Sequence, residues 1–337
     1  MKNTKWLILL IGLAVVGGGA LAAYVAWGPS RASNAASSTT VEKVAEPSTH
    51  SPAESDHSHE ENSESAHAND ALGGHAHFIA VQPRTNRLLM GAHNGLWQSI
   101  DEGKSWSRIE IQGKLDSTDF MNFVIDPTNA NVMYAGGHDL AVVKSTDGGR
   151  TWTKANTGLA GTDIHALTYD ARFQRLFAFS VDYGIFESKD GGASWQRKDD
   201  GPRNPNVQSF AFLDVPTDME QSMGKENRGY LFAGTAGGVF RANPCFCGWT
   251  PMGEKLFQYA TTYTLIVNPS DNMIYAGTKD RIFKSADAGE KWVQLLSGQK
   301  IVGIAINPTD SRILYAVSEG GIVFRSQDGG ANWERRN

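Results

Sequence analysis

The chain has 337 residues, of which 40% are hydrophobic, and a formal net charge of −5 at pH 7. This length is enough for one large domain. Its lysines and arginines are scattered and form no basic stripe, which argues against a nucleic-acid-binding protein.

An apolar segment lies near the N-terminus. Lys2 and Lys5 precede an uncharged stretch at residues 6–27, whose length matches the about 20 residues that a membrane-crossing helix needs. The flanking lysines favour a cytoplasmic N-terminus, so we expect residues 1–27 to be a cytoplasmic stub and a transmembrane anchor. A cleaved signal peptide is the alternative, because small residues follow at 31–36. The anchored form predicts a single-pass protein of the cell membrane with the rest of the chain on the extracytoplasmic side.

Residues 28–74 are rich in Ser, Ala, Glu and His and contain almost no large apolar side chains. Such a segment cannot bury a core, and we expect a disordered linker. His57 and His59 stand among acidic residues within it. Two interpretations stay open for this stretch: loose binding of Zn²⁺ or Cu²⁺, or a solvated acidic spacer.

Five copies of the pattern Ser-x-Asp-x-Gly-x-x-Trp, an Asp box, dominate the rest of the chain. In each box the Asp is expected to accept backbone hydrogen bonds within a turn, and the Gly to tolerate a positive φ. Since five identical catalytic sites would make no sense, we interpret these carboxylates as structural. They are Asp101, Asp147, Asp190, Asp287 and Asp328. A sixth, eroded copy ends at Trp249, and the six tryptophans recur at the spacing of propeller blades.

Each repeat can be divided into four short strands. In the second repeat they are predicted at residues 120–125, 131–136, 140–145 and 152–155, separated by Pro, Asn, Asp and Gly. The fold class is therefore all-β, and residues 75–337 are predicted to form a six-bladed β-propeller with Asp-box turns. The ring is expected to close by packing the last blade against the first. The blades are predicted to begin near His75, Asp119, Asp163, Asn206, Thr261 and Lys300.

All histidines of the predicted propeller are expected on one face. Strands of a four-stranded meander alternate in direction, so the start of the first strand lies on the same face as the turn between the second and third strands. These positions hold His75, His77, His93, His138 and His165, together with Asp119 and Asp163.

Imidazole suits Zn, Cu, Fe and Ni. We therefore expect a transition-metal or small-ligand site at the mouth of the channel, built from His75, His77 and His165 with Asp163, Asp119, His93 or His138, and with Cu or Zn as the ion. The alternative is that these residues are isolated polar side chains that line a wet funnel.

Cys245 and Cys247 replace the Asp-box turn of the fourth repeat. Outside the cytoplasm a local disulfide is the favoured interpretation, and binding of copper or mercury is the alternative. The pair is expected on the face opposite the histidines, so the two groups should not share an ion. The fourth repeat also carries a polar insertion at residues 216–229, either a partner-contact loop or a floppy excursion.

The repeats resemble the BNR/Asp-box propellers over residues 75–337. That superfamily includes sialidases, plant-polysaccharide glycosidases, the sortilin ectodomain and photosystem II assembly factors. The opening at residues 75–83 is similar to exported bacterial BNR-repeat proteins that are labelled glycosyl hydrolases. Sialidases of this superfamily bind the carboxylate of their substrate with three arginines at the channel mouth, so the resemblance implies three such arginines if this chain were a sialidase. No first strand of this chain begins with Arg, which argues against a sialidase.

These observations favour a membrane-tethered extracytoplasmic propeller that binds rather than catalyses. We expect a binding or assembly platform for a protein partner, with a transition-metal site at the channel mouth. The alternative is a non-sialidase glycoside hydrolase that acts on a glycan with Asp119 and Asp163, since glycosidases use two carboxylates about 5–9.5 Å apart.

Overall fold

The computed structural model describes residues 75–203, 206–257 and 260–337. The predicted anchor at 1–27 and the predicted linker at 28–74 lie outside the described residues. Within the described ranges, no helix combines the length and the apolar character that a membrane crossing needs.

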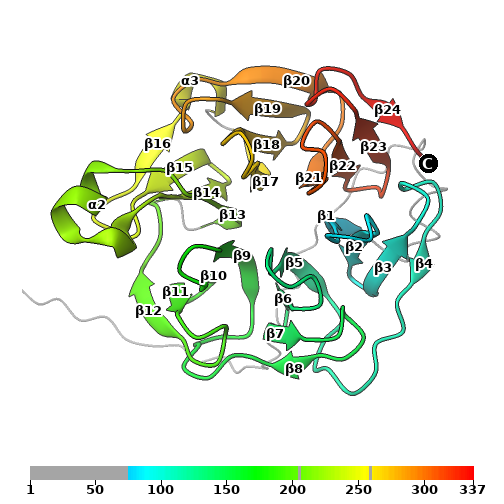
Figure 1. The fold of residues 1–337 in the computed structure, drawn as a ribbon, viewed down its shortest axis with the longest axis horizontal. Coiled ribbons are helices and arrows are strands. Elements are labelled where there is room, and N and C mark those ends of the chain that lie inside the picture. Colours follow the sequence, from blue (N-terminus) through cyan, green and yellow to red (C-terminus); the bar gives the residue numbers. More distant parts are fainter. Residues whose placement is uncertain (1–74, 204–205, 258–259) are drawn as a thin grey trace, which may run out of the picture. The chain divides into compact units, whose positions relative to one another are not determined.

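Six four-stranded antiparallel sheets surround a common axis, with the first strand of each sheet innermost (Figure 1). The strands of each sheet follow one another in chain order. The prediction of an all-β, six-bladed propeller is confirmed. Blade one contains β1 (Ala76–Val81), β2 (Leu88–Ala92), β3 (Gly95–Ser99) and β4 (Ser107–Arg108). Blade two contains β5 (Phe120–Ile125), β6 (Met133–Gly137), β7 (Ala141–Ser145) and β8 (Thr153–Lys154). Blade three contains β9 (Ile164–Asp170), β10 (Arg175–Ser180), β11 (Gly184–Ser188) and β12 (Gln196–Asp199).

The second half of the ring repeats this arrangement. Blade four contains β13 (Val207–Leu213), β14 (Tyr230–Thr235), β15 (Gly238–Ala242) and β16 (Thr250–Met252). Blade five contains β17 (Thr262–Val267), β18 (Ile274–Thr278), β19 (Arg281–Ser285) and β20 (Val293–Ser297). Blade six contains β21 (Ile301–Ile306), β22 (Leu314–Ser318), β23 (Val323–Ser326) and β24 (Glu334–Arg335). Every first strand begins one residue after the predicted start of its blade.

The hydrophobic core lies between the blades. Each of six buried apolar clusters joins side chains from two neighbouring sheets. One cluster joins Ile79 and Met90 of blade one to Tyr315 and Val317 of blade six. At the same junction the strands approach so closely that a Cβ on Gly303 would lie 2.6 Å from the backbone nitrogen of Ile79. The ring therefore closes by packing its last blade against its first, as predicted, and each blade is built from one continuous stretch of chain.

The turn between the third and fourth strands is held by the residues of the Asp box. In the first box the Asp101 carboxylate accepts hydrogen bonds from the backbone N–H of Ser105 at 2.9 Å and from the Ser105 hydroxyl at 2.5 Å. The bond from the Ser105 hydroxyl, and after it the bond from the Ser105 backbone, lowers the pKa of Asp101 to about 2. The same backbone bond recurs in the other four boxes. The fourth strand begins one residue after each Trp rather than at it. In the first box the indole of Trp106 donates to the Gly103 carbonyl.

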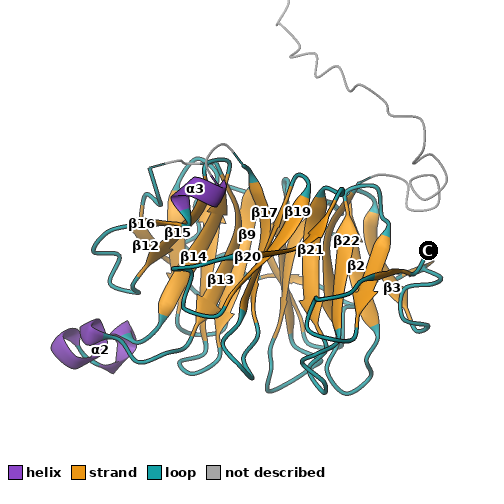
Figure 2. Cartoon of the chain, turned by 90° about the horizontal axis from the view of Figure 1, so that it is seen from above, coloured by secondary structure: helices purple, strands orange, loops and turns teal. Residues whose placement is uncertain are grey.

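Helical segments occur where the sequence suggested none. The insertion of blade four forms α2 (Asp218–Met223) and the 3₁₀ turn η1 (Lys225–Asn227), and α3 (Glu254–Phe257) precedes β17. Thr217 caps α2 by accepting a hydrogen bond from the backbone N–H of Glu220. The side view shows α2 and α3 on opposite rims of the ring (Figure 2). The insertion is therefore a folded element on the rim away from the starts of the first strands.

Candidate metal centre

The predicted site residues gather on one rim of blades one to three. His93 occupies the turn between β2 and β3, and His138 occupies the corresponding turn between β6 and β7. Asp119 and Asp163 directly precede β5 and β9. His77 and His165 lie near the starts of β1 and β9, so hairpin turns and strand starts together supply all the side chains.

A β-bulge sets the position of His77 and His165. All six first strands shift register near their start. In blade one Ala76 pairs with Ala92 and Phe78 with Gly91, which leaves His77 as the extra residue. In blade three His165 is extra in the same way, between Ile164 and Ala166. A bulge bends its strand and re-aims the extra side chain, and sequence spacing alone did not reveal this device.

The structure forms a first trio from His77, His93 and Asp119. Nε2 of His77 lies 3.2 Å from Nδ1 of His93 and 3.3 Å from Oδ1 of Asp119. Nδ1 of His93 lies 3.0 Å from Oδ2 of Asp119. The first trio spans the junction between blades one and two.

A second trio consists of His138, Asp163 and His165. Nε2 of His138 lies 3.2 Å from Nε2 of His165 and 3.6 Å from Oδ1 of Asp163. Nε2 of His165 lies 3.2 Å from the same carboxylate oxygen. The second trio spans the junction between blades two and three.

One short contact joins the two trios. Nδ1 of His138 lies 2.8 Å from Oδ2 of Asp119, so this imidazole faces the first trio with one nitrogen and belongs to the second with the other. Asp119 is thus the centre of the cluster, because three imidazoles contact its carboxylate. The sequence pointed to Asp119 as one optional member and did not reveal this central place.

Burial and charge prepare these side chains for binding a cation. The side chains of His77 and His165 are 13% and 19% exposed. Burial lowers the pKa of each of these histidines and outweighs the neighbouring carboxylates, so both rings are neutral at pH 7. Burial by itself raises the pKa of Asp119, but its contacts with His77, His93 and His138 outweigh burial and hold the pKa well below its usual value. Neutral imidazoles and ionised carboxylates are the protonation states that bind metal.

Each trio also holds one buried carboxylate oxygen that forms no hydrogen bond of good geometry. Among the described residues, this is true of Oδ1 of Asp119 and Oδ1 of Asp163, although Nε2 of His77 lies 3.3 Å from the former and Nε2 of His165 lies 3.2 Å from the latter. A buried acceptor without a partner costs free energy, so such atoms in a native fold call for an explanation. A metal ion between the three side chains of each trio would satisfy both oxygens.

The remaining residue of the predicted site lies at the edge of the cluster. The ring of His75 is 6.0 Å from that of His93, centroid to centroid, and His75 belongs to neither trio. His75 stands just before β1, whereas the bulge inside β1 carries His77 into the cluster.

Gly137 is a site residue that sequence reasoning missed. A Cβ on this residue would lie 1.7 Å from the backbone oxygen of Asp119, so only glycine permits the strands to approach here. The available signal was the pair Gly136–Gly137, since the second strands of blades four and five have Gly-Thr at the matching place.

A channel runs along the axis of the ring, and His77 is the trio residue that lines it. Its volume is about 540 Å³, and the first strands of all six blades line it. On the same rim, at blades five and six, Nζ of Lys300 lies 4.4 Å from the centre of the Tyr263 ring and 2.6 Å from Oε1 of Glu319. The channel wall also includes Met121, the extra residue in the bulge of blade two. In the bulges of the neighbouring blades one and three, the extra residues are His77 and His165.

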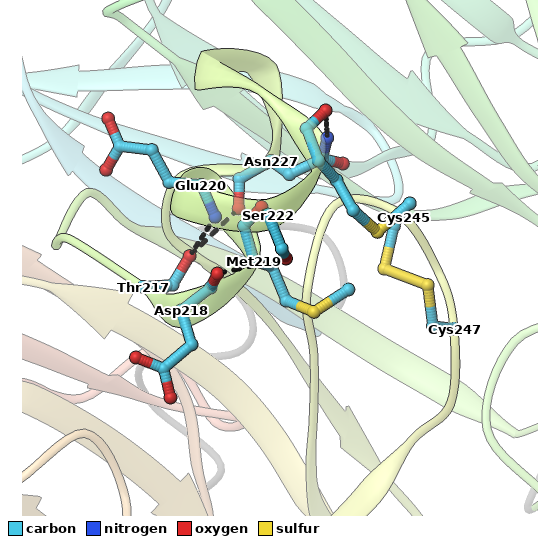
Figure 3. Close-up of a disulfide and its surroundings, with 9 residues drawn as sticks. Thr217, Asp218, Met219, Glu220, Ser222, Asn227, Cys245 and Cys247 are labelled. Atoms are coloured by element: carbon cyan, nitrogen blue, oxygen red, sulfur yellow. Dashed lines mark hydrogen bonds between the residues drawn. A yellow bond between two sulfur atoms is a disulfide. The ribbon is translucent and has the colours of Figure 1, made fainter. Parts of the chain in front are cut away.

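Cys245 and Cys247 are joined by a disulfide in the turn between β15 and β16. The surroundings of this disulfide include α2, with Met219 on the side toward the two sulfur atoms (Figure 3). The turn between third and fourth strands lies on the rim opposite the histidines, so the disulfide is separate from the trios.

The alternative of a glycoside hydrolase finds little support in this geometry. One carboxylic acid of a glycosidase pair needs a raised pKa to protonate the leaving group. The pKa of Asp119 is instead lowered, and both Asp119 and Asp163 are engaged by imidazoles.

Comparison with known proteins shows the fold of this chain. No protein-family model and no curated protein matches the sequence. The chain is similar in structure to the GH74 xyloglucanase from Xanthomonas campestris, with 18% identity, a TM-score of 0.54 and coverage of 78% of this chain and 47% of the enzyme. It is also similar to the GH74 enzyme of Niastella koreensis, with 17% identity, a TM-score of 0.58 and coverage of 78% and 45%.

A third similar structure is YCF48 bound to D1 peptide, with 18% identity, a TM-score of 0.49 and coverage of 78% of this chain and 82% of YCF48. The chain spans less than half the length of the two GH74 enzymes. At these identities the likeness to GH74 enzymes establishes the propeller fold and leaves the chemistry to the residues on the rim.

Proposed function

We propose that this protein is a metal-dependent binding propeller, which holds a divalent transition-metal ion on the rim of blades one to three and presents it to a partner. The observation that carries the proposal is the spacing of the donor atoms. Ligand atoms that lie about 2.0–2.1 Å from a tetrahedral Zn²⁺ ion lie about 3.3–3.4 Å from one another. In the first trio the donor atoms are separated by 3.2 Å between the imidazoles, 3.3 Å from His77 to Oδ1 of Asp119 and 3.0 Å from His93 to Oδ2 of Asp119. In the second trio the three donor atoms are separated by 3.2 Å, 3.6 Å and 3.2 Å.

The ligand chemistry narrows the choice of ion. Each trio offers two imidazoles and one carboxylate. Imidazole favours Zn, Cu, Fe and Ni, whereas Mg and Ca prefer sites made of oxygen atoms. We therefore propose Zn²⁺ or Cu²⁺ as the ion.

The number of protein ligands supports binding of a partner. Three protein ligands leave at least one coordination position of a tetrahedral ion for an outside ligand. His93 and His138 are 43% and 41% exposed, so the trios are open to the solvent. A protein partner that offers an imidazole, a carboxylate or a thiolate from its surface would complete the coordination.

The proposed location rests on the sequence and on the disulfide. The lysine-flanked apolar stretch at residues 6–27 supports a tether that leaves the propeller on the extracytoplasmic side. The Cys245–Cys247 disulfide is in keeping with an oxidising compartment, since disulfides are rare where cells keep thiols reduced. We therefore propose that the metal-bearing rim works outside the cytoplasm.

Metal analysis tests the proposal, provided that the histidines outside the propeller are removed. The parent for this experiment is the 337-residue chain with His50, His57, His59 and His67 changed to Gln, called the linker-substituted chain. After loading with Zn²⁺ and gel filtration, elemental analysis should find bound zinc. A second chain that also carries His77→Ala and His165→Ala should bind none.

A matched control separates the trios from general surface charge. Glu319→Gln removes a carboxylate of blade six that pairs with Lys300 and belongs to neither trio, and it should leave the zinc content unchanged. A linker-substituted chain that retains neither Zn²⁺ nor Cu²⁺ would refute the proposal.

A further inference from the structure

We infer that the rim binds two metal ions, one in each trio, and that the hydrogen bond between Asp119 and His138 couples them. This inference rests on the proposed metal binding and specifies how many ions are bound and how they communicate.

The first argument is that each trio is geometrically complete. Within the first trio, all three pairs of residues bring donor atoms to between 3.0 Å and 3.3 Å. Within the second, all three pairs lie between 3.2 Å and 3.6 Å. In the second trio these distances join one set of three atoms, whereas in the first trio His77 approaches Oδ1 of Asp119 and His93 approaches Oδ2. Each trio therefore brings one carboxylate and two imidazoles together, and neither needs a residue of the other to enclose an ion.

The second argument is that the repeat of the fold duplicates the ligand set. His93 and His138 occupy the same turn, between second and third strands, in blades one and two. Asp119 and Asp163 occupy the same position, directly before the first strand, in the blade that follows. At both junctions, a turn histidine of one blade thus meets the aspartate of the next.

The third ligand of each trio comes from a bulge. His77 reaches the first junction from blade one, and His165 reaches the second junction from blade three. The blade between them has Met121 at its bulge and so adds no third imidazole. Two quasi-equivalent sites therefore follow from two neighbouring repeats.

The third argument concerns His138, which separates the two trios. Its Nδ1 lies 2.8 Å from Oδ2 of Asp119, and its Nε2 lies 3.2 Å from Nε2 of His165. A single ion cannot lie between the carboxylate of Asp119 and the side chains of the second trio, because the imidazole ring of His138 occupies that space. A cluster centred on one ion would instead turn all its donor atoms to one point.

The same contact provides the coupling. A neutral imidazole that donates Nδ1–H to a carboxylate keeps the lone pair of Nε2 for a metal. Asp119 therefore serves as a ligand in the first trio and as the partner that orients His138 in the second. For the second ion, Asp119 is a positioning residue.

The unused carboxylate oxygens agree with two ions. Oδ1 of Asp119 lies in the first trio, and Oδ1 of Asp163 lies in the second. Both oxygens are buried, and among the described residues neither forms a hydrogen bond of good geometry, although an imidazole nitrogen lies 3.3 Å and 3.2 Å away, respectively. One ion would satisfy one of these oxygens, whereas two ions satisfy both.

Stoichiometry tests the number of ions. Zn²⁺ is titrated into the linker-substituted chain by calorimetry, and bound zinc is counted by elemental analysis. We expect two equivalents for the parent, one for His77→Ala, one for His165→Ala and none for the double variant. One equivalent in the parent, lost completely in either single variant, would establish a single shared ion and overturn the inference while leaving the proposed function intact. No bound zinc in the parent would overturn both.

Two variants that both remove the first ion test the coupling. His77→Ala leaves the Asp119–His138 hydrogen bond in place, so the remaining ion should bind with the affinity that it has in the parent. Asp119→Ala removes the hydrogen bond as well, and loss of such an outer-shell partner typically weakens metal binding by about 10–100-fold. Asp139→Asn changes an exposed carboxylate beside His138 that belongs to neither trio, and it should bind two equivalents like the parent. Equal affinities for the remaining ion in His77→Ala and Asp119→Ala would refute the coupling.

Discussion

Nδ1 of His93 lies 3.0 Å from Oδ2 of Asp119, and this contact crosses from blade one to blade two. Each trio likewise takes ligands from two neighbouring blades. A metal ion bound in either trio would therefore add a direct link on this rim between two sheets that also meet through apolar packing and through hydrogen bonds such as that from Asn122 to the carbonyl of Ile164.

We predict that Zn²⁺ stabilises the folded ring. An ion that binds only the folded state adds about 2.7 kcal/mol to the free energy of unfolding when its free concentration is a hundred times its dissociation constant. Urea unfolding of the linker-substituted chain, with Zn²⁺ and with a chelator, measures the difference. The His77→Ala, His165→Ala double variant should unfold at the same urea concentration under both conditions, and an equal zinc effect in this variant would contradict the prediction.

The sequence predicted the ring and the face of the ring that bears the histidines, because both depend on local patterns. Five Asp boxes and one eroded copy mark the same turn in successive blades, and the alternation of strand direction then assigns His93 and His138 to the opposite rim. Even the first strands begin within one residue of their predicted starts. Periodic spacing suffices for this level of detail.

The sequence did not predict which of these residues touch. The contacts depend on bulges that re-aim His77 and His165 and on the close approach at Gly137, neither of which leaves a periodic signal. For the same reason His75 was placed in the site although it lies at its edge. The helix α2 was missed because its six residues bury no side chain and so have no apolar periodicity.

We predict that Arg175→Met strongly destabilises the fold. The guanidinium of Arg175 is 4% exposed, lies 2.6 Å from Oδ2 of the buried Asp170 and donates to the backbone carbonyl of Glu226 in η1 at 2.9 Å. Loss of the cation leaves the Asp170 carboxylate buried without its ion-pair partner, and removal of one member of a buried pair costs about 3–5 kcal/mol. Urea unfolding measures this loss.

Arg172→Met is the matched control for this prediction. Arg172 lies three positions before Arg175 but is 43% exposed, and its contact with Asp214 is 3.8 Å long. Exposed pairs of this kind contribute about 0–1 kcal/mol. Similar losses for the two variants would show that the buried ion pair of blade three does not carry the effect.

We predict that loss of the disulfide has a small effect on stability and none on metal binding. The bond joins residues two positions apart, and the stabilisation from a disulfide falls with the length of the loop that it closes. For so short a loop the chain-entropy estimate is about 1–2 kcal/mol. The double variant Cys245→Ser, Cys247→Ser should therefore unfold at a slightly lower urea concentration. It should still bind as much zinc as its parent, since the trios lie on the other rim; a loss of zinc would place a metal ligand at the cysteines.

We predict that an Asp box contributes stability that is lost in acid. The Ser105 hydroxyl and the Ser105 backbone N–H lower the pKa of Asp101 to about 2, below the value of about 3.9 in an unfolded chain. A pKa that is depressed in the folded state gives stability that is fully present above the unfolded pKa and is lost as the pH falls toward the folded pKa. Asp101→Asn lacks this contribution, so the difference in unfolding free energy from the parent should be constant above about pH 5 and shrink between about pH 4 and pH 2. Urea unfolding across this range, with a chelator to keep the trios free of metal, provides the measurement. Asp182→Asn alters an exposed carboxylate outside the boxes and is the control.

The difference in unfolding free energy between Asp101→Asn and the parent could instead stay the same down to pH 2. That result would show that the charge of the Asp101 carboxylate does not stabilise its turn.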